Sequence, residues 1–178
     1  MTRVFSRFLR RFRRDDDGGP SVEFVIVFVP FVIIFAAAFE MGMMMTRHVM
    51  LERGLDMAVR EVRLNTAADI DEDDLKTMVC NSSGLIPDCT NQLKLEMRPI
   101  DLRAWSNIPR AADCVDVDNP FAPSRNFVNG GQNMMMVVRA CARAQPLLPK
   151  FGLGYFLAEM DNGYYQLVST SAFVMEPL

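Results

Sequence analysis

The residues whose types could do chemistry are few, and their spacing is unlike that of a catalytic site. The chain has one histidine, His48, and its neighbours Arg47 and Val49 offer no nucleophile for an imidazole base to activate. There is no GxxxxGK[ST] phosphate-binding loop, and residues 152–154 form only a fragment of a glycine-rich loop. We therefore expect a protein that is not an enzyme, with no catalytic residues, no cofactor and no small-molecule substrate.

The cysteines offer a different chemistry, which is disulfide formation. An even number of cysteines in an exported domain favours two disulfides, for which three pairings are possible, with free thiols as the alternative. The most economical pairing closes a small loop with the first two cysteines and ties a long loop to a strand with the last two. Zinc sites usually contain a pair of cysteines two to four residues apart. This sequence contains no such pair, so we expect no metal. The disulfide candidates are Cys80, Cys89, Cys114 and Cys141.

Acidic residues at positions 69–74 are the other candidate for ion binding. Asp69, Asp71 and Asp73 have the spacing that begins an EF-hand calcium loop. The sixth position is then Asp74 where a glycine is needed, and the twelfth is Cys80 where a glutamate is needed. We therefore interpret residues 69–80 as a short helix with an N-cap and an acidic first turn.

The element that precedes these residues is an apolar run from Val22 to Met45, and no charge occurs between Phe24 and Phe39. A spanning helix needs roughly 20 apolar residues for a hydrocarbon core of ~30 Å. Glu23 and Glu40 lie about 25 Å apart along such a helix, so we expect them near the two membrane faces. The sequence predicts a single-pass transmembrane helix.

The charge distribution predicts the orientation of this helix. Six arginines precede the apolar run, whereas acidic residues outnumber Lys and Arg in the rest of the chain. The positive-inside rule then places the N-terminus in the cytoplasm and the C-terminal domain outside the cytoplasmic (inner) membrane, in the periplasm or extracellularly. The acidic remainder would repel phosphate, so we expect no nucleic-acid partner. Residues 1–20 are interpreted as a basic cytoplasmic leader that also contacts anionic lipid headgroups.

Helical periodicity continues beyond the apolar run. Leu51, Leu55, Ala58 and Val62 form an apolar stripe on an otherwise charged segment. Gly54 within it costs only around 1 kcal/mol of helix propensity, which is too little to end the helix. We therefore expect one helix over residues 21–65, with a transmembrane and a membrane-proximal part.

Residues 66–178 are expected to form a small exported α+β domain with a short antiparallel sheet. Three segments have the features of β-strands, namely alternating apolar and polar residues or many β-branched and aromatic residues. They are Leu93–Arg98, Met134–Ala144 and Tyr164–Met175. Proline, glycine and asparagine between the first two predict a long loop over residues 99–133. The apolar segment after Pro146 is expected to be a short helix or a patch that rests on the membrane.

The stretch from Gly18 to Gly42 resembles the N-terminal signature of TadE-like proteins, the pseudopilins of the tight-adherence (Tad/Flp) pilus system. That signature is a glycine, a few small residues, Val-Glu-Phe, an apolar run with a proline, then a glutamate and a glycine. Gly18, residues 22–24, Pro30, Glu40 and Gly42 fill it. Residues 50–65 are also similar to the membrane-proximal helix of alphaproteobacterial members, and the end of the chain is similar to the end of the family.

The resemblance implies a pilin-like fold and a prepilin-type processing motif formed by Gly18, Gly19, Glu23 and Phe24. A prepilin peptidase would cut between Gly18 and Gly19, which places Glu23 at mature position 5. There it would meet the new N-terminal ammonium of a neighbouring subunit. Pro20 departs from the family pattern beside the scissile bond, so cleavage of the leader stays open.

The function that the resemblance implies is that of a minor pseudopilin or an assembly factor for Flp-type pili. The expected partners are the lipid bilayer and other Tad components, namely pseudopilins, the prepilin peptidase and the inner-membrane platform. The alternative from another class is a membrane-anchored extracytoplasmic binding or adhesion module that does not enter a pilus.

Overall fold

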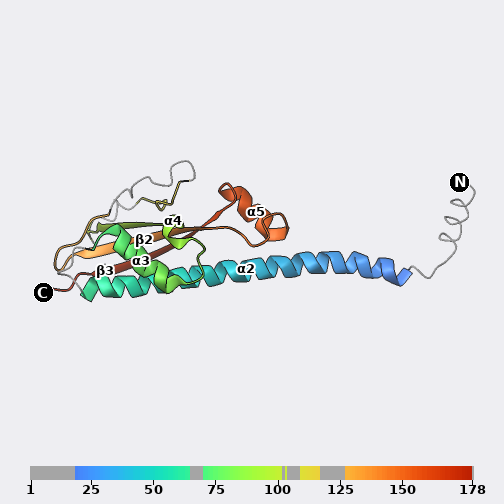
Figure 1. Ribbon diagram of the computed structural model, residues 1–178, viewed down its shortest axis with the longest axis horizontal. Helices are drawn as coiled ribbons and strands as arrows, with labels where there is room; N and C mark the ends of the chain where they lie inside the picture. The colour runs from blue at the N-terminus through green and yellow to red at the C-terminus, as the bar shows by residue number, and fades with distance from the viewer. Residues whose placement is uncertain (1–18, 65–69, 102, 104–108, 117–126, 178) are drawn as a thin grey trace, which may run out of the picture.

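The structure is a computed structural model that describes residues 19–64, 70–101, 103, 109–116 and 127–177. A long N-terminal helix leads into a small α+β domain whose sheet lies along the C-terminal part of that helix (Figure 1). The elements in chain order are α2 (Gly19–Leu64), α3 (Glu72–Ser83), α4 (Cys89–Gln92), β1 (Leu93–Pro99), β2 (Met135–Ala144), α5 (Gly152–Met160) and β3 (Tyr165–Val174).

The predicted long helix is confirmed as α2, a single helix of 46 residues that contains Pro30 without ending there. It corresponds to about 69 Å at the usual helical rise. Within the described residues it is the one helix long and apolar enough to cross a membrane. Its most apolar 18-residue window has a mean hydropathy of 2.7, and none of that window is buried against the rest of the chain.

The three predicted strands form one antiparallel sheet in the order β1-β2-β3. Leu95 of β1 pairs with Ala140 of β2, which in turn pairs with Ser169 of β3. Each end of the three strands lies within one residue of its expected position. The agreement is close because alternating apolar residues mark a strand well. The predicted α+β class is confirmed.

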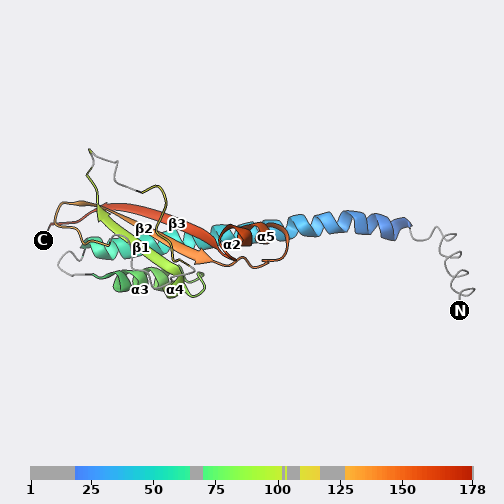
Figure 2. The ribbon, with the colours of Figure 1, turned by 90° about the horizontal axis from the view of Figure 1, so that it is seen from above.

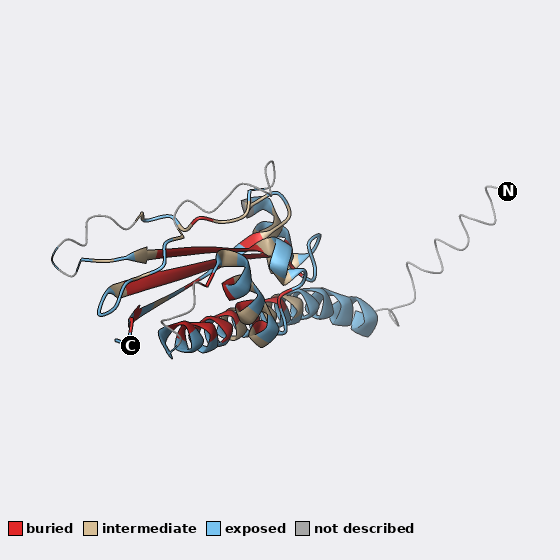
Figure 3. Cartoon of the chain, turned by 60° about the vertical axis from the view of Figure 1, so that its left-hand side comes forward, coloured by how far each residue is buried: buried red, intermediate tan, exposed pale blue. Residues whose placement is uncertain are grey.

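The hydrophobic core lies between the sheet and the C-terminal part of α2, with α3 beside it (Figure 2). The predicted stripe of Leu51, Leu55, Ala58 and Val62 is buried there, and Leu51 and Leu55 are fully buried. Figure 3 shows buried residues along this part of α2 and exposed residues along its N-terminal part. The helix therefore has a covered and an uncovered half.

Helix α3 begins at Glu72, three residues later than expected, because Asp71 is its N-cap. The Asp71 side chain accepts a hydrogen bond from the backbone N–H of Asp74 at 2.8 Å. Asp69 lies outside the described residues. The last turn of α3 approaches α2 closely at Gly54, where an added Cβ would meet the Val79 carbonyl oxygen at 2.7 Å. Gly54 is therefore a packing requirement rather than a weak point of the helix.

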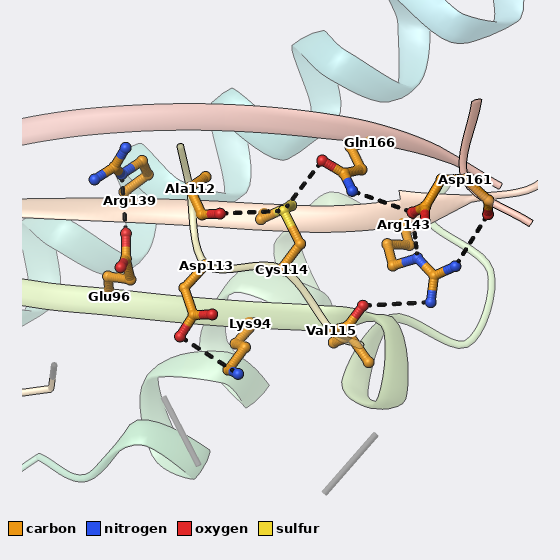
Figure 4. The surroundings of a disulfide bond; sticks show 11 residues. Lys94, Glu96, Ala112, Asp113, Cys114, Val115, Arg139, Arg143, Asp161 and Gln166 are labelled. Carbon is orange, nitrogen blue, oxygen red and sulfur yellow. Dashed lines mark hydrogen bonds and ion pairs between the residues drawn. A yellow bond between two sulfur atoms is a disulfide. The ribbon is translucent and has the colours of Figure 1, made fainter. Parts of the chain in front are cut away.

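The outer face of the sheet is polar and buried along β1 and β2, whereas it is exposed along β3. Lys94 and Glu96 alternate with the apolar residues of β1, yet both are buried beneath residues 109–116 (Figure 4). Lys94 forms an ion pair with Asp113 at 3.3 Å, and Glu96 forms one with Arg139 of β2 at 3.0 Å. Residues 109–116 of the expected long loop therefore cover the outer face of β1 and β2.

The structure contains two disulfides with the pairing that the spacing favoured. Cys80–Cys89 joins α3 to the start of α4, and Cys114–Cys141 ties the covering segment to the middle strand. No free cysteine remains, since these four are all the cysteines of the chain.

Candidate functional site

The predicted processing motif lies at the start of α2. Gly19, Glu23 and Phe24 all occupy its first turns and are exposed. An added Cβ at Gly19 would meet nothing within 4 Å. Gly18 lies outside the described residues, as do the arginines of the leader. The end of the helix that carries Glu23 is therefore open to a partner or to lipid.

The apolar residues that follow are also exposed on every side of the helix. Phe24 stacks on Phe28 with ring centroids 5.0 Å apart, and Phe31 pairs with Phe35 at 6.4 Å. These contacts run along one helix and leave its surface uncovered. An exposed apolar surface of this extent marks a membrane or protein interaction site.

Glu40 lies on the same helix as Glu23 but differs from it in burial and in hydrogen bonding. It is 1% exposed, and its carboxylate accepts two backbone hydrogen bonds from the loop between β2 and α5. The N–H of Leu147 donates to Oε1 at 2.9 Å, and that of Leu148 donates to Oε2 at 3.1 Å. A buried carboxylate is costly without partners, and these two N–H groups supply them.

Arg47 lies two helical turns after Glu40 and holds the same loop. Its Nη1 donates to the Gln145 carbonyl at 2.7 Å and to the Tyr165 hydroxyl at 2.8 Å. The guanidinium side chain is 5% exposed. We call Glu40 and Arg47 together the loop clamp, because both fix the β2–α5 loop to α2.

The loop clamp joins the two halves of α2 to the domain at one place. Glu40 marks the first buried residue of the helix, and the buried stripe begins after Arg47. A charge-assisted hydrogen bond is roughly twice as strong as a neutral one, so the clamp fixes the orientation of the domain on the helix. The arrangement positions the surface of the domain on the helix.

The other signature residues have no such contacts. Pro30 lies inside the uncovered half, and an added Cβ at Gly42 would meet nothing within 4 Å. The Gly42 carbonyl accepts a hydrogen bond from the Thr46 hydroxyl at 2.8 Å. His48 lies outside the apolar run, where its Nε2 is 3.1 Å from the Val168 carbonyl oxygen of β3.

Helix α5 follows the clamped loop and carries one perturbed titratable group. The Tyr155 hydroxyl donates to Glu159 at 2.9 Å. This hydrogen bond, together with the charge of the carboxylate, raises the pKa of the phenol.

The structure offers no arrangement suited to a metal ion within the residues it describes. No group of three or more His, Cys, Asp and Glu side chains gathers there. A cavity of about 320 Å³ lies beside Arg47 and is also lined by Gln92 and Arg143. Residues of the β2–α5 loop also line this cavity, so it lies where the loop clamp holds the domain on α2.

Sequence reasoning placed Glu40 at a membrane face and missed its partners. The partners are backbone groups of Leu147 and Leu148, which no side-chain pattern marks. The burial of Arg47 had a usable signal, because Arg47 follows Glu40 by two turns and precedes the buried stripe on the same face.

Comparison with known proteins gives one match. Residues 19–60 match the family model of TadE-like proteins, a range that begins with α2 and includes both the uncovered half and the loop clamp. No curated protein and no solved structure matches the chain. The predicted resemblance to TadE-like proteins is confirmed over this segment.

Proposed function

We propose that this chain is a single-pass membrane protein of the tight-adherence pilus system, where it acts without catalysis as a minor pseudopilin or an assembly factor. The observation that carries the proposal is the coincidence of the TadE-like segment with an uncovered apolar helix. Such a helix has to be covered by lipid before assembly and by other helices after it.

Glu23 is the residue on which the mechanism depends. It is the one carboxylate in the uncovered half, and a carboxylate within a bilayer is costly unless it is paired. Cleavage between Gly18 and Gly19 would create an N-terminal ammonium four residues earlier on the same helix. Pairing of Glu23 with the ammonium of a neighbouring subunit would then draw the subunit into an assembly.

The proposed orientation places the N-terminus in the cytoplasm and the domain outside the cytoplasmic membrane. The six arginines that precede the apolar run support the cytoplasmic side. The two disulfides support an oxidising compartment for the domain. The partners that fit this placement are other pilus subunits, the prepilin peptidase and the inner-membrane platform.

The test uses variants of the chromosomal gene in the native host, with pili counted by electron microscopy and the protein quantified by immunoblot. Glu23→Ala and Gly18→Ala should each strongly reduce piliation at unchanged protein level. Glu61→Ala is the matched control, since Glu61 is an exposed glutamate in the covered half of the same helix. Normal piliation in both test variants would refute the proposed mechanism.

One measurement distinguishes this proposal from the alternative, a membrane-anchored binding module. The intact mass and N-terminal sequence of the protein from native membranes should show a chain that starts at Gly19. A chain that retains Met1 or Thr2 would instead favour an anchored module or an unprocessed assembly factor.

A further inference from the structure

The feature that leads beyond the pilus role is the position of α5. Helix α5 lies past the end of the sheet, over the middle of α2 (Figure 1). At its first residue, Gly152, an added Cβ would lie 4.0 Å from the Ile33 carbonyl oxygen. The domain therefore reaches down the helix well beyond Glu40, toward the N-terminal end.

The free length of α2 is shorter than a bilayer core. All residues from 19 to 35 are exposed, and the first partly buried ones are Ala36 and Ala37. Residues 19–35 span roughly 25 Å, whereas the hydrocarbon core is about 30 Å thick. Asp15, Asp16 and Asp17 in the uncleaved chain, or the new N-terminal ammonium in a chain cut after Gly18, limit any extension into the bilayer from that side. A membrane around this helix has to reach the level of α5.

The surface of α5 and its leading loop suits that position. The segment 146–160 exposes large apolar side chains, and no charged residue occurs between Lys150 and Glu159. Phe156 is 65% exposed. Tyr155 and Glu159 provide a polar rim, and tyrosine is enriched at membrane–water interfaces. The exposed apolar residues are Leu147, Leu148, Phe151, Tyr155 and Phe156.

The loop clamp gives an independent reason for a position in the membrane. A hydrocarbon core that starts beside Glu23 would extend for roughly 20 residues and would include Glu40. Its carboxylate would face lipid there if the segment 146–160 did not cover it. The N–H groups of Leu147 and Leu148 come from this same segment, so one element covers Glu40 and presents apolar residues outward.

We propose that the segment 146–160 is a second, shallow membrane-binding element, which inserts beside α2 from the exported side. Its ligand is the lipid of the outer leaflet, because its apolar surface is continuous with the uncovered half of α2. This inference depends on α2 spanning a membrane and is independent of entry into a pilus.

The test measures quenching of tryptophan fluorescence by brominated phosphatidylcholine in vesicles that contain the full chain. Trp105 is the only tryptophan and is first replaced by phenylalanine. In that background Phe156→Trp reports on α5, and Ile26→Trp reports on the uncovered half of α2. Val174→Trp is the matched control, since Val174 is 50% exposed on β3 and belongs to neither membrane-facing surface. Circular dichroism and intact disulfides verify folding of each variant.

The proposal predicts that Phe156→Trp is quenched strongly, roughly threefold more than Val174→Trp, as expected for an apolar side chain 5–10 Å deep in the interface. Equal and weak quenching of these two variants, with Ile26→Trp quenched, would overturn the proposal and leave the membrane helix intact. A blue-shifted Phe156→Trp emission without quenching would also overturn it, because protein rather than lipid would then cover α5. Absence of quenching at Ile26→Trp would contradict membrane anchoring itself.

Discussion

The two halves of α2 are one continuous helix in two environments. Residues 19–39 are apolar on nearly every side, and the domain barely touches them. Residues 40–64 carry a narrow apolar stripe that the sheet and α3 cover, with charged residues on the other side. An all-round apolar surface needs a surrounding apolar phase, whereas a stripe needs a single packing partner. The distribution of side chains, rather than the helix itself, separates the anchor from the scaffold.

Glu23 and Glu40 show the same contrast within one residue type. Glu23 is exposed in the uncovered half, and its carboxylate has no hydrogen bond or ion pair with the described residues. Glu40 is buried and accepts two backbone hydrogen bonds. One carboxylate is thus available to a partner, and the other already has its partners within the chain.

The largest expected effect on stability comes from shortening one buried side chain in the covered half. Leu51→Ala should lower the free energy of unfolding of the domain by about 2–5 kcal/mol, because Leu51 is fully buried in the core. Ile26→Ala, in the uncovered half, should leave that free energy within about 0.5 kcal/mol of the parent. Urea denaturation of the full chain in detergent micelles, followed by circular dichroism, measures both. Equal losses would mean that the two halves share one core.

The glycines of α2 allow a second comparison of a covered and an open site. Gly54→Ala should destabilise the domain by about 1–3 kcal/mol, because the new Cβ would press against the Val79 carbonyl of α3. Gly42→Ala meets nothing within 4 Å and should stabilise the helix by up to about 1 kcal/mol. Thermal unfolding of the two variants in the same detergent gives opposite shifts of Tm if α3 packs as described. Two shifts of the same sign would disprove the close approach at Gly54.

A smaller destabilisation than at Leu51 or Gly54 is expected at the loop clamp. Glu40→Gln removes the charge and leaves one amide oxygen for the N–H groups of Leu147 and Leu148, at a cost of about 1–2 kcal/mol. Hydrogen–deuterium exchange should accelerate at those two amides and stay unchanged in β2. Glu52→Gln, an exposed site on the same helix, is the control. Unchanged protection of both amides in Glu40→Gln would show that the Glu40 carboxylate does not hold the β2–α5 loop.

Sequence reasoning recovered the features that local patterns determine. The stripe of Leu51 and Leu55 follows helical periodicity, and the alternation in residues 93–98 follows strand periodicity, so both were predicted with nearly correct bounds. The burial of Lys94 and Glu96 was not predictable, because residues 109–116 that cover them carry no regular pattern. The role of Glu40 depends on backbone groups about a hundred residues later in the chain, which no local signal reveals.

The central claim is that the uncovered half of α2 lies within a bilayer, and that the buried stripe after Arg47 lies outside it. Spin labels at Ile26, Phe35, Val49 and Met57 test it directly, since all four are large, exposed apolar positions on one helix. Accessibility to oxygen and to a nickel chelate is measured on the full chain in nanodiscs, with the native disulfides intact. Labels at Ile26 and Phe35 should be more accessible to oxygen, and labels at Val49 and Met57 should be more accessible to the chelate. Equal chelate accessibility at all four positions would contradict it.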